Sequence, residues 1–125
     1  MKGLLLVAHG SRRDESNDEV RQLARQLSED AGGQYDQLAC AFLELAEPSI
    51  PDGLRAFIRA GVSEITVLPY FLSAGRHVVT DIPAEVNIIR AESPEVEINL
   101  APYLGASPDL VNILLGLADG IRENS

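Results

Sequence analysis

Four short apolar runs alternate with longer segments whose apolar residues recur at helical spacing, and this alternation constrains the fold more than any other feature. The runs that predict strands are Gly3–Ala8, Leu38–Leu43, Glu64–Leu68 and Glu95–Leu100. Repeated strand–helix units of this length predict an α/β fold with an open, mostly parallel four-stranded sheet and helices on both faces. Gly3–Ala8 is apolar throughout, which is typical of a central strand, whereas Glu95–Leu100 alternates and is expected near an edge. We expect a single domain over residues 1–125.

Capping signals predict where the helices begin. Ser16 with Glu19 three residues later fits a capping box at the start of the first helix. Asp81 is expected to cap the third helix, with Pro83 in its first turn. Ser107 followed by proline is expected to open the last helix.

The last helix carries more apolar residues than one buried stripe needs. Val111 and Leu115 lie off its main stripe. That stripe is formed by Leu110, Ile113, Leu114, Leu117 and Ile121. An apolar face this wide fits either the core of the same domain or a contact between subunits, and both interpretations remain open.

Charge and composition exclude several classes of partner. The formal net charge is −9, which argues against nucleic acid and anionic membranes, because both are bound through basic patches. No run approaches the roughly 20 apolar residues that span a membrane. Cys40 is the single cysteine, so no intramolecular disulfide forms, and its apolar neighbours predict a buried thiol. Without a recognisable leader sequence, a cytoplasmic protein is expected.

Chemically versatile side chains follow the predicted strands. In an open parallel sheet, ligands bind beyond the carboxyl ends of the strands. His9 follows the first strand, Glu44 the second, and His77 ends the loop after the third. Both histidines of the chain are therefore expected at one edge of the sheet together with a carboxylate. Imidazole binds divalent transition metals and exchanges protons near neutral pH, so the set predicts a site that handles a metal.

Further polar and aromatic residues accompany this set. Arg12, Arg13 and Arg76 flank the histidines, and guanidinium groups suit carboxylate ligands. Ser11 is expected to make a hydrogen bond at the start of the first helix. The third-strand loop supplies further candidates for substrate binding: Tyr70, Phe71, Leu72, Ser73, Ala74, Gly75 and Arg76. Its aromatic and aliphatic members fit either a wall for a flat ligand or the end of the core.

Three segments resemble the sirohydrochlorin chelatases of the CbiX/SirB group. They are Ala8–Arg12 (AHGSR), Phe42–Glu44 followed by Pro48–Ser49, and Pro69–His77 followed by Asp81–Pro83. The resemblance covers essentially the whole chain and implies a chelatase-like, flavodoxin-like three-layer fold. It also implies a small class II enzyme (a lyase) of the short, single-domain form, which works as a homodimer with the cleft between subunits. Certain short forms end in a histidine-rich tail, which this chain lacks.

The resemblance assigns roles to the candidate residues. It implies that His9 and His77 bind the metal and accept protons, with Glu44 in support. The substrates are then a sirohydrochlorin-type tetrapyrrole and a divalent metal, with no permanently bound cofactor. Cobalt is expected on family grounds, with iron or nickel as alternatives. The reaction belongs to cobalamin or sirohaem biosynthesis.

Two other functions were weighed against the chelatase. A non-enzymatic carrier of metal or tetrapyrrole would use the same histidines. A phosphohistidine phosphotransferase also places His-Gly after the first strand, but such enzymes usually have arginine before the histidine, where this chain has Ala8.

Overall fold

The computed structural model describes residues 1–123, and side chains are described for residues 1–120. It confirms the predicted α/β fold with four parallel strands. The elements are β1 (Lys2–Ala8), α1 (Asp14–Asp30), β2 (Gln37–Phe42), α2 (Ile50–Arg59), β3 (Glu64–Pro69), a π-helical turn η1 (His77–Asp81), α3 (Ile82–Glu92), β4 (Glu97–Leu100), a 3-10 turn η2 (Leu104–Ala106) and α4 (Leu110–Glu123). The sheet order is β2-β1-β3-β4, and every pairing is parallel.

The sheet has β1 and β3 inside and β2 and β4 at its edges. Leu5 of β1 pairs with Ala39 of β2 on one side and Val67 of β3 on the other. The edge position predicted for the fourth strand is confirmed. The second strand was expected to be buried, and this is only half right, because β2 is the opposite edge and its first residues stay accessible. Cys40 is accordingly half-buried rather than a core residue, and burial raises the pKa of its thiol.

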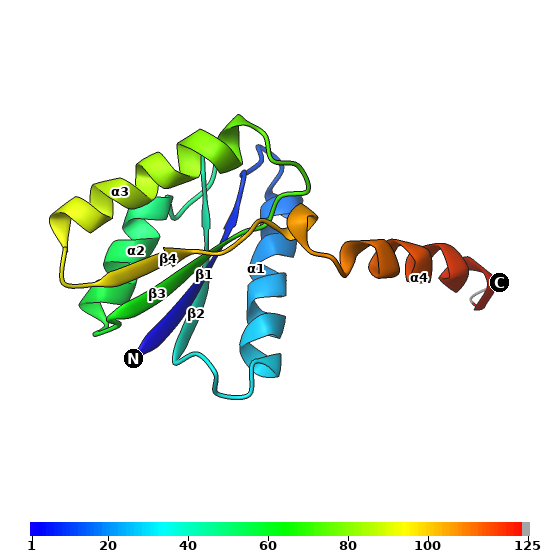
Figure 1. Ribbon diagram of the computed structural model, residues 1–125, viewed down its shortest axis with the longest axis horizontal. Helices are drawn as coiled ribbons and strands as arrows, with labels where there is room; N and C mark the ends of the chain where they lie inside the picture. Colours follow the sequence, from blue (N-terminus) through cyan, green and yellow to red (C-terminus); the bar gives the residue numbers. More distant parts are fainter. Residues whose placement is uncertain (124–125) are drawn as a thin grey trace.

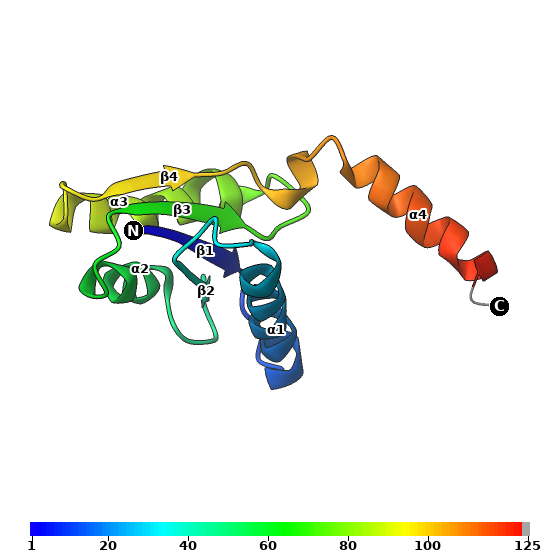
Figure 2. The same cartoon turned by 90° about the horizontal axis from the view of Figure 1, so that it is seen from below.

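The core lies on the side of the sheet that α2 and α3 cover, while α1 covers the other side (Figures 1 and 2). Residues of one parity along each strand point into this core, as period-two alternation requires. The fully buried members include Leu5, Val67, Leu54, Ile82 and Val86. The two-sided cover agrees with the prediction of helices on both faces.

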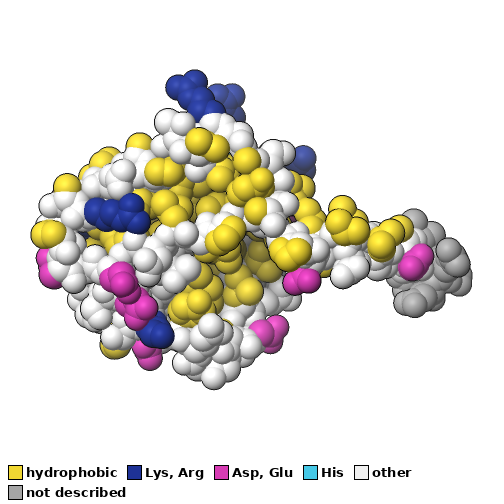
Figure 3. Space-filling model, in the orientation of Figure 1, with side chains coloured by type: hydrophobic (Ala, Val, Ile, Leu, Met, Phe, Trp, Pro, Cys, Tyr) yellow, Lys and Arg dark blue, Asp and Glu magenta, His cyan; other side chains and the backbone are white. Residues whose placement is uncertain are grey.

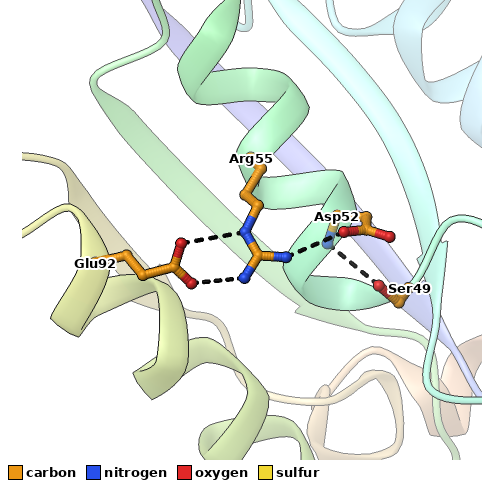
Figure 4. A network of polar contacts seen from close by, with 4 residues as sticks. All are labelled: Ser49, Asp52, Arg55 and Glu92. Atoms are coloured by element: carbon orange, nitrogen blue, oxygen red, sulfur yellow. Dashed lines mark hydrogen bonds and ion pairs between the residues drawn. The ribbon is translucent and has the colours of Figure 1, made fainter.

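A polar network joins the two helices of the core side (Figure 4). Arg55 of α2 donates to both carboxylate oxygens of Glu92 on α3, at 3.2 and 2.6 Å, and to Asp52 at 3.1 Å. Ser49 caps α2 by accepting a hydrogen bond from the backbone N–H of Asp52. Hydrogen bonding to Arg55 lowers the pKa of Glu92.

The predicted capping box of the first helix is wrong. The helix α1 begins at Asp14, so Ser16 already lies inside its first turn. Asn17 organises the entry instead, because its buried amide accepts from the backbone N–H of Ser11 and donates to the Ser11 carbonyl. The Ser11 hydroxyl accepts from the N–H of Arg13, which agrees with the hydrogen bond expected of it at the helix start.

The predicted cap of the third helix is also wrong. Asp81 has helical backbone angles and makes no capping hydrogen bond. The helical path begins earlier, at His77, and runs through η1 directly into α3. Asp81 therefore stands one helical turn after His77, and its side chain turns back toward that residue.

The last helix extends away from the rest of the domain (Figures 1 and 2). Its large apolar side chains from Val111 to Leu117 are exposed and Leu110 is half-buried, so the interpretation of this stripe as core of the same domain is wrong. Ile121, also assigned to the stripe, lies outside the described side chains. Among the described residues, no helix is long and apolar enough to cross a membrane.

Candidate metal and proton-transfer site

The two histidines meet at the carboxyl edge of the sheet, as predicted. His9 is the first residue after β1, and His77 opens η1 at the end of the loop after β3. Their ring centroids are 4.7 Å apart, and the ring planes stand at 64°. Residues 68 positions apart in the chain thus form one pair of imidazoles, because β1 and β3 are neighbours in the sheet.

A close backbone approach brings Glu44 to His9. The N–H of Glu44 donates to the His9 carbonyl at 3.0 Å. Between them Gly10 has φ +96°, and a β-carbon at this position would collide with the Glu44 carbonyl oxygen. Only glycine combines that backbone conformation with that approach. As a result, Oε1 of Glu44 lies 3.0 Å from Nε2 of His9.

The hydrogen bonds of His9 define what each ring nitrogen does. Nδ1 lies 2.8 Å from the Gly10 carbonyl, which can only accept, so Nδ1 carries the proton of the neutral ring. Nε2 donates to the carboxylate of Glu44 when the ring is protonated, and it presents a lone pair there when a cation takes the place of that proton. The 3.0 Å between Nε2 and Oε1 matches neighbouring ligands at right angles around an ion with bonds of about 2.1 Å. These two atoms are therefore spaced to share one divalent ion.

His77 has a carboxylate partner of its own. Its Nδ1 lies 2.9 Å from Oδ2 of Asp81, four residues further along the helical turn. A carboxylate at Nδ1 orients the ring and fixes the proton on that nitrogen. Nε2 is thereby left to act as a ligand or as a proton acceptor.

An open, acidic pocket of about 250 Å³ adjoins the pair. It is lined by Leu43, Glu44, His77, Asp81, Ala84 and Glu85. Three carboxylates around one hollow favour a cation. In the part of the chain that the structure describes, however, no three His, Cys, Asp or Glu residues are grouped to hold an ion. A metal bound beside these residues would therefore need further ligands from other groups.

The three arginines lie outside this acidic pocket. Arg12 and Arg76 are exposed and form no ion pair within the described residues. Arg13 is exposed as well, 3.9 Å from a Glu15 carboxylate oxygen. All three belong to the loops that carry His9 and His77.

The loop after β3 forms an apolar wall on the other side of His77. Tyr70 and Leu72 are exposed, whereas Phe71 is half-buried with its ring 6.4 Å from that of His77. With Leu104 these residues line an apolar hollow of about 230 Å³. The two interpretations of this loop therefore each hold for part of it. Phe71 packs against the core, whereas Tyr70 and Leu72 are exposed. Ser73, Ala74, Gly75 and Arg76 complete its exposed part.

Two acidic residues of this region were missed by sequence reasoning. The sequence pattern around Asp81 predicts a helix cap, but its position four residues after His77 places both side chains on one face of a continuous helix. Glu85, one further turn on, received no role. The four-residue spacing of His77, Asp81 and Glu85 could have indicated that these side chains share one helix face. That prediction requires the helix to begin at His77.

The chain matches the CbiX family model over residues 3–119. It is 30% identical to the sirohydrochlorin cobaltochelatase of Methanococcus maripaludis, covering 97% of this chain and 100% of that protein. It is 42% identical to the chloroplastic sirohydrochlorin ferrochelatase of Arabidopsis thaliana, over 66% of this chain and 36% of the relative. The sirohydrochlorin chelatase SirB of Bacillus subtilis subspecies spizizenii, solved in complex with cobalt, superimposes with a TM-score of 0.85 at 27% identity. That match covers 96% of this chain and 50% of the SirB chain.

Proposed function

The chain belongs to the CbiX family, and we propose that it is a sirohydrochlorin chelatase that inserts a divalent metal into the tetrapyrrole ring. The observation that carries the proposal is the pair of imidazoles 4.7 Å apart, each held by its own carboxylate. Cobalt is the proposed metal, with iron or nickel as alternatives, since imidazole and carboxylate ligands suit all three. The metal is a substrate here, and no permanently bound cofactor is part of the proposal.

Metal insertion exchanges two pyrrole protons for one divalent ion, without any change of oxidation state. In the proposed reaction, Nε2 of His9 and Oε1 of Glu44 hold the ion beside the ring. Nε2 of His77 accepts one pyrrole proton, and Asp81 stabilises the imidazolium that forms. Once the ion has entered the ring, Nε2 of His9 is released to accept the second proton. A pair of bases is thus matched to a pair of protons.

The macrocycle is proposed to lie across the rim of the site. Its carboxylates would bind Arg12, Arg13 and Arg76, with Ser11 and the exposed loop residues Ser73–Gly75 nearby. Its apolar face would rest on Tyr70, Phe71 and Leu72. The chain carries a net charge of −9, so long-range attraction does not bring the anionic substrate to it. Local guanidinium contacts carry the recognition, because charges beyond about 8 Å are screened at physiological salt.

The proposed active form is a homodimer. The matched part is 50% of the SirB chain, so two copies of this chain match the length of that relative. The proposal keeps the cytoplasmic location expected from the sequence. With cobalt as substrate, the product belongs to cobalamin biosynthesis, and with iron to sirohaem biosynthesis.

The proposal is tested by following the absorbance of sirohydrochlorin on addition of Co²⁺, with the protein-free rate subtracted. We expect His9→Ala and His77→Ala each to lower the catalysed rate by about 100-fold or more, since each removes a ligand or proton acceptor. Glu44→Gln should also lower it, whereas Glu47→Gln, on the same loop but away from His9, should not. Full activity of both folded histidine variants contradicts the proposal. Stoichiometric binding without turnover would instead identify a carrier.

A further inference from the structure

The helix α4 is unusual because its stretch from Val111 to Ala118 is almost wholly apolar and yet exposed. No charged residue occurs from Leu110 to Ala118. Val111 is 63% exposed, Leu114 56%, Leu115 58% and Leu117 68%. A helix that is hydrophobic all round is normally buried, and a helix of 14 residues is marginal in water on its own. A surface outside the described contacts of α4 must therefore cover it.

The connection to α4 directs it away from its own domain. Ser107 has extended backbone angles, φ −67° and ψ 131°, which the following proline enforces. The Ser107 hydroxyl then accepts from the N–H of Asp109, and its carbonyl accepts from the N–H of Leu110. Only the hydrogen-bonded turn Ser107–Asp109 connects η2 to α4. To pack against its own domain, the helix would have to reverse direction within Ser107–Asp109.

An uncovered apolar groove lies beside the root of α4. On this side of the sheet α1 is the helix that covers the strands, whereas α2 and α3 share the other side (Figure 1). The groove has a volume of about 330 Å³ and an almost wholly apolar surface. It is lined by Leu6, Leu23, Leu27, Leu68, Tyr70 and Leu104. Figure 3 shows hydrophobic side chains in the body of the domain next to the start of α4 and along the helix itself.

We propose that α4 of one copy of this chain occupies the groove of a second copy, and that the second copy returns the same contact. Each chain carries one uncovered helix and one uncovered groove, so a reciprocal two-fold exchange covers both and closes the assembly. Two chains of net charge −9 repel each other, and the uncharged stretch Leu110–Ala118 is the part that approaches without that penalty. The inference rests on the homodimer proposed above and specifies what joins its copies.

The exchange also touches the candidate site. Tyr70 and Leu104 line both the groove and the apolar hollow beside His77. The N–H of Gly105 in η2 donates to the Phe71 carbonyl at 3.0 Å, and its α-carbon packs against the Leu72 backbone. In this arrangement, η2 at the start of one α4 contacts the loop that ends in His77, and α4 of the second copy packs against the same loop from the groove. In the exchanged dimer, this loop is held from both sides.

The test uses two complementary variants of the whole chain. The helix variant carries Leu114→Glu with Leu117→Glu and keeps its groove. The groove variant carries Leu23→Glu with Leu27→Glu and keeps its helix. Ile88→Glu, an exposed apolar residue on α3, is the matched control. Mass is measured by light scattering after size exclusion. Thermal unfolding verifies that each variant is folded. If the groove variant is not folded, the milder Leu27→Gln replaces it.

The exchange predicts a wild type and an Ile88→Glu variant with twice the 13.5 kDa of one chain. Each of the two other variants should be monomeric, with the dissociation constant of the dimer raised on the order of 100-fold or more. Mixing them should restore a dimer through one intact helix–groove contact.

Three results would overturn the inference. A monomeric wild type would mean that α4 covers its own groove, and it would also contradict the proposed homodimer. A groove variant that stays dimeric would leave the homodimer standing with a different interface. Two folded monomeric variants that do not combine on mixing would likewise rule out the exchange. The experiment measures the oligomeric state, so its outcome does not depend on whether the protein is a chelatase.

Discussion

Nδ1 of His77 lies 2.9 Å from Oδ2 of Asp81, one helical turn further along the chain. The contact exists because η1 and α3 form one continuous helical path that begins at His77. It gives the second histidine a carboxylate partner, as Glu44 gives the first, but at the other ring nitrogen. Glu44 lies at Nε2 of His9, where the metal is proposed to bind, and Asp81 lies at Nδ1 of His77.

This difference predicts that Asp81 acts through His77 on the proton-transfer step. Asp81→Asn keeps the size of the side chain but removes the charge that stabilises the imidazolium. We expect kcat for cobalt insertion to fall about 10- to 100-fold, with KM for sirohydrochlorin little changed. Glu85→Gln is the matched control, because Glu85 lines the same pocket without bonding either histidine. Equal losses in the two variants would mean that only the charge of the pocket matters.

Gly10 is predicted to be essential for the position of Glu44. Gly10→Ala places a β-carbon against the Glu44 carbonyl in a backbone conformation with φ +96°. Gly32→Ala is the control, since Gly32 has φ +61° with open space around it. The control should lose about 1–2 kcal/mol of unfolding free energy from backbone strain alone. Gly10→Ala should lose more in chemical denaturation and should also lose chelatase activity, whereas a loss equal to that of the control would remove the argument.

Charge reversal at Arg76 is predicted to affect substrate binding more than chemistry. Arg76→Glu should raise the KM for sirohydrochlorin more than it lowers kcat, because the guanidinium is proposed to bind a substrate carboxylate before the metal is transferred. Arg59→Glu is the control. It makes the same charge change at the end of α2, which lies near the amino ends of the strands, away from the candidate site. An unchanged KM in steady-state kinetics of Arg76→Glu, or an equal rise in the Arg59 variant, would contradict the proposal.

The link between Arg55 and Glu92 predicts a pH-dependent contribution to stability. The bond to Arg55 lowers the pKa of Glu92 in the folded state. The contribution is therefore complete above the unfolded pKa of about 4.3 and is lost as the pH falls through the lower folded value. Glu92→Gln should lower the melting temperature slightly at neutral pH, and the difference from wild type should disappear near pH 2–3. The effect is small and weakened by salt, since both groups are exposed.

The matched control for this prediction is Glu95→Gln, which removes an exposed carboxylate outside the network. Its melting temperature should follow that of wild type over the same pH range. A difference between Glu92→Gln and wild type that persists at low pH would show that packing, rather than the ion pair, holds α2 against α3.

The sequence was sufficient for the strands and for the edge at which the site lies. An apolar run such as Gly3–Ala8 fits a central parallel strand, and the order of strands and helices leaves few topologies. Because ligands bind at the carboxyl edge, the positions of His9, Glu44 and His77 just after strands were enough to predict their meeting. The helix starts were predicted wrongly. Ser16 and Asp81 each match a capping pattern, but both helices begin earlier in the chain and include these residues.

What the sequence by itself determined is the identity of the chemical groups and the edge of the sheet that presents them. What only the tertiary structure decided is how each group is partnered: Glu44 at one histidine, Asp81 at the other, and a last helix whose apolar side chains from Val111 to Leu117 stay exposed. The physical reason is that strand and helix patterns are local and repeat along the chain. Hydrogen bonds between separate loops, and the cover of a helix, depend on a chain path that no local pattern encodes.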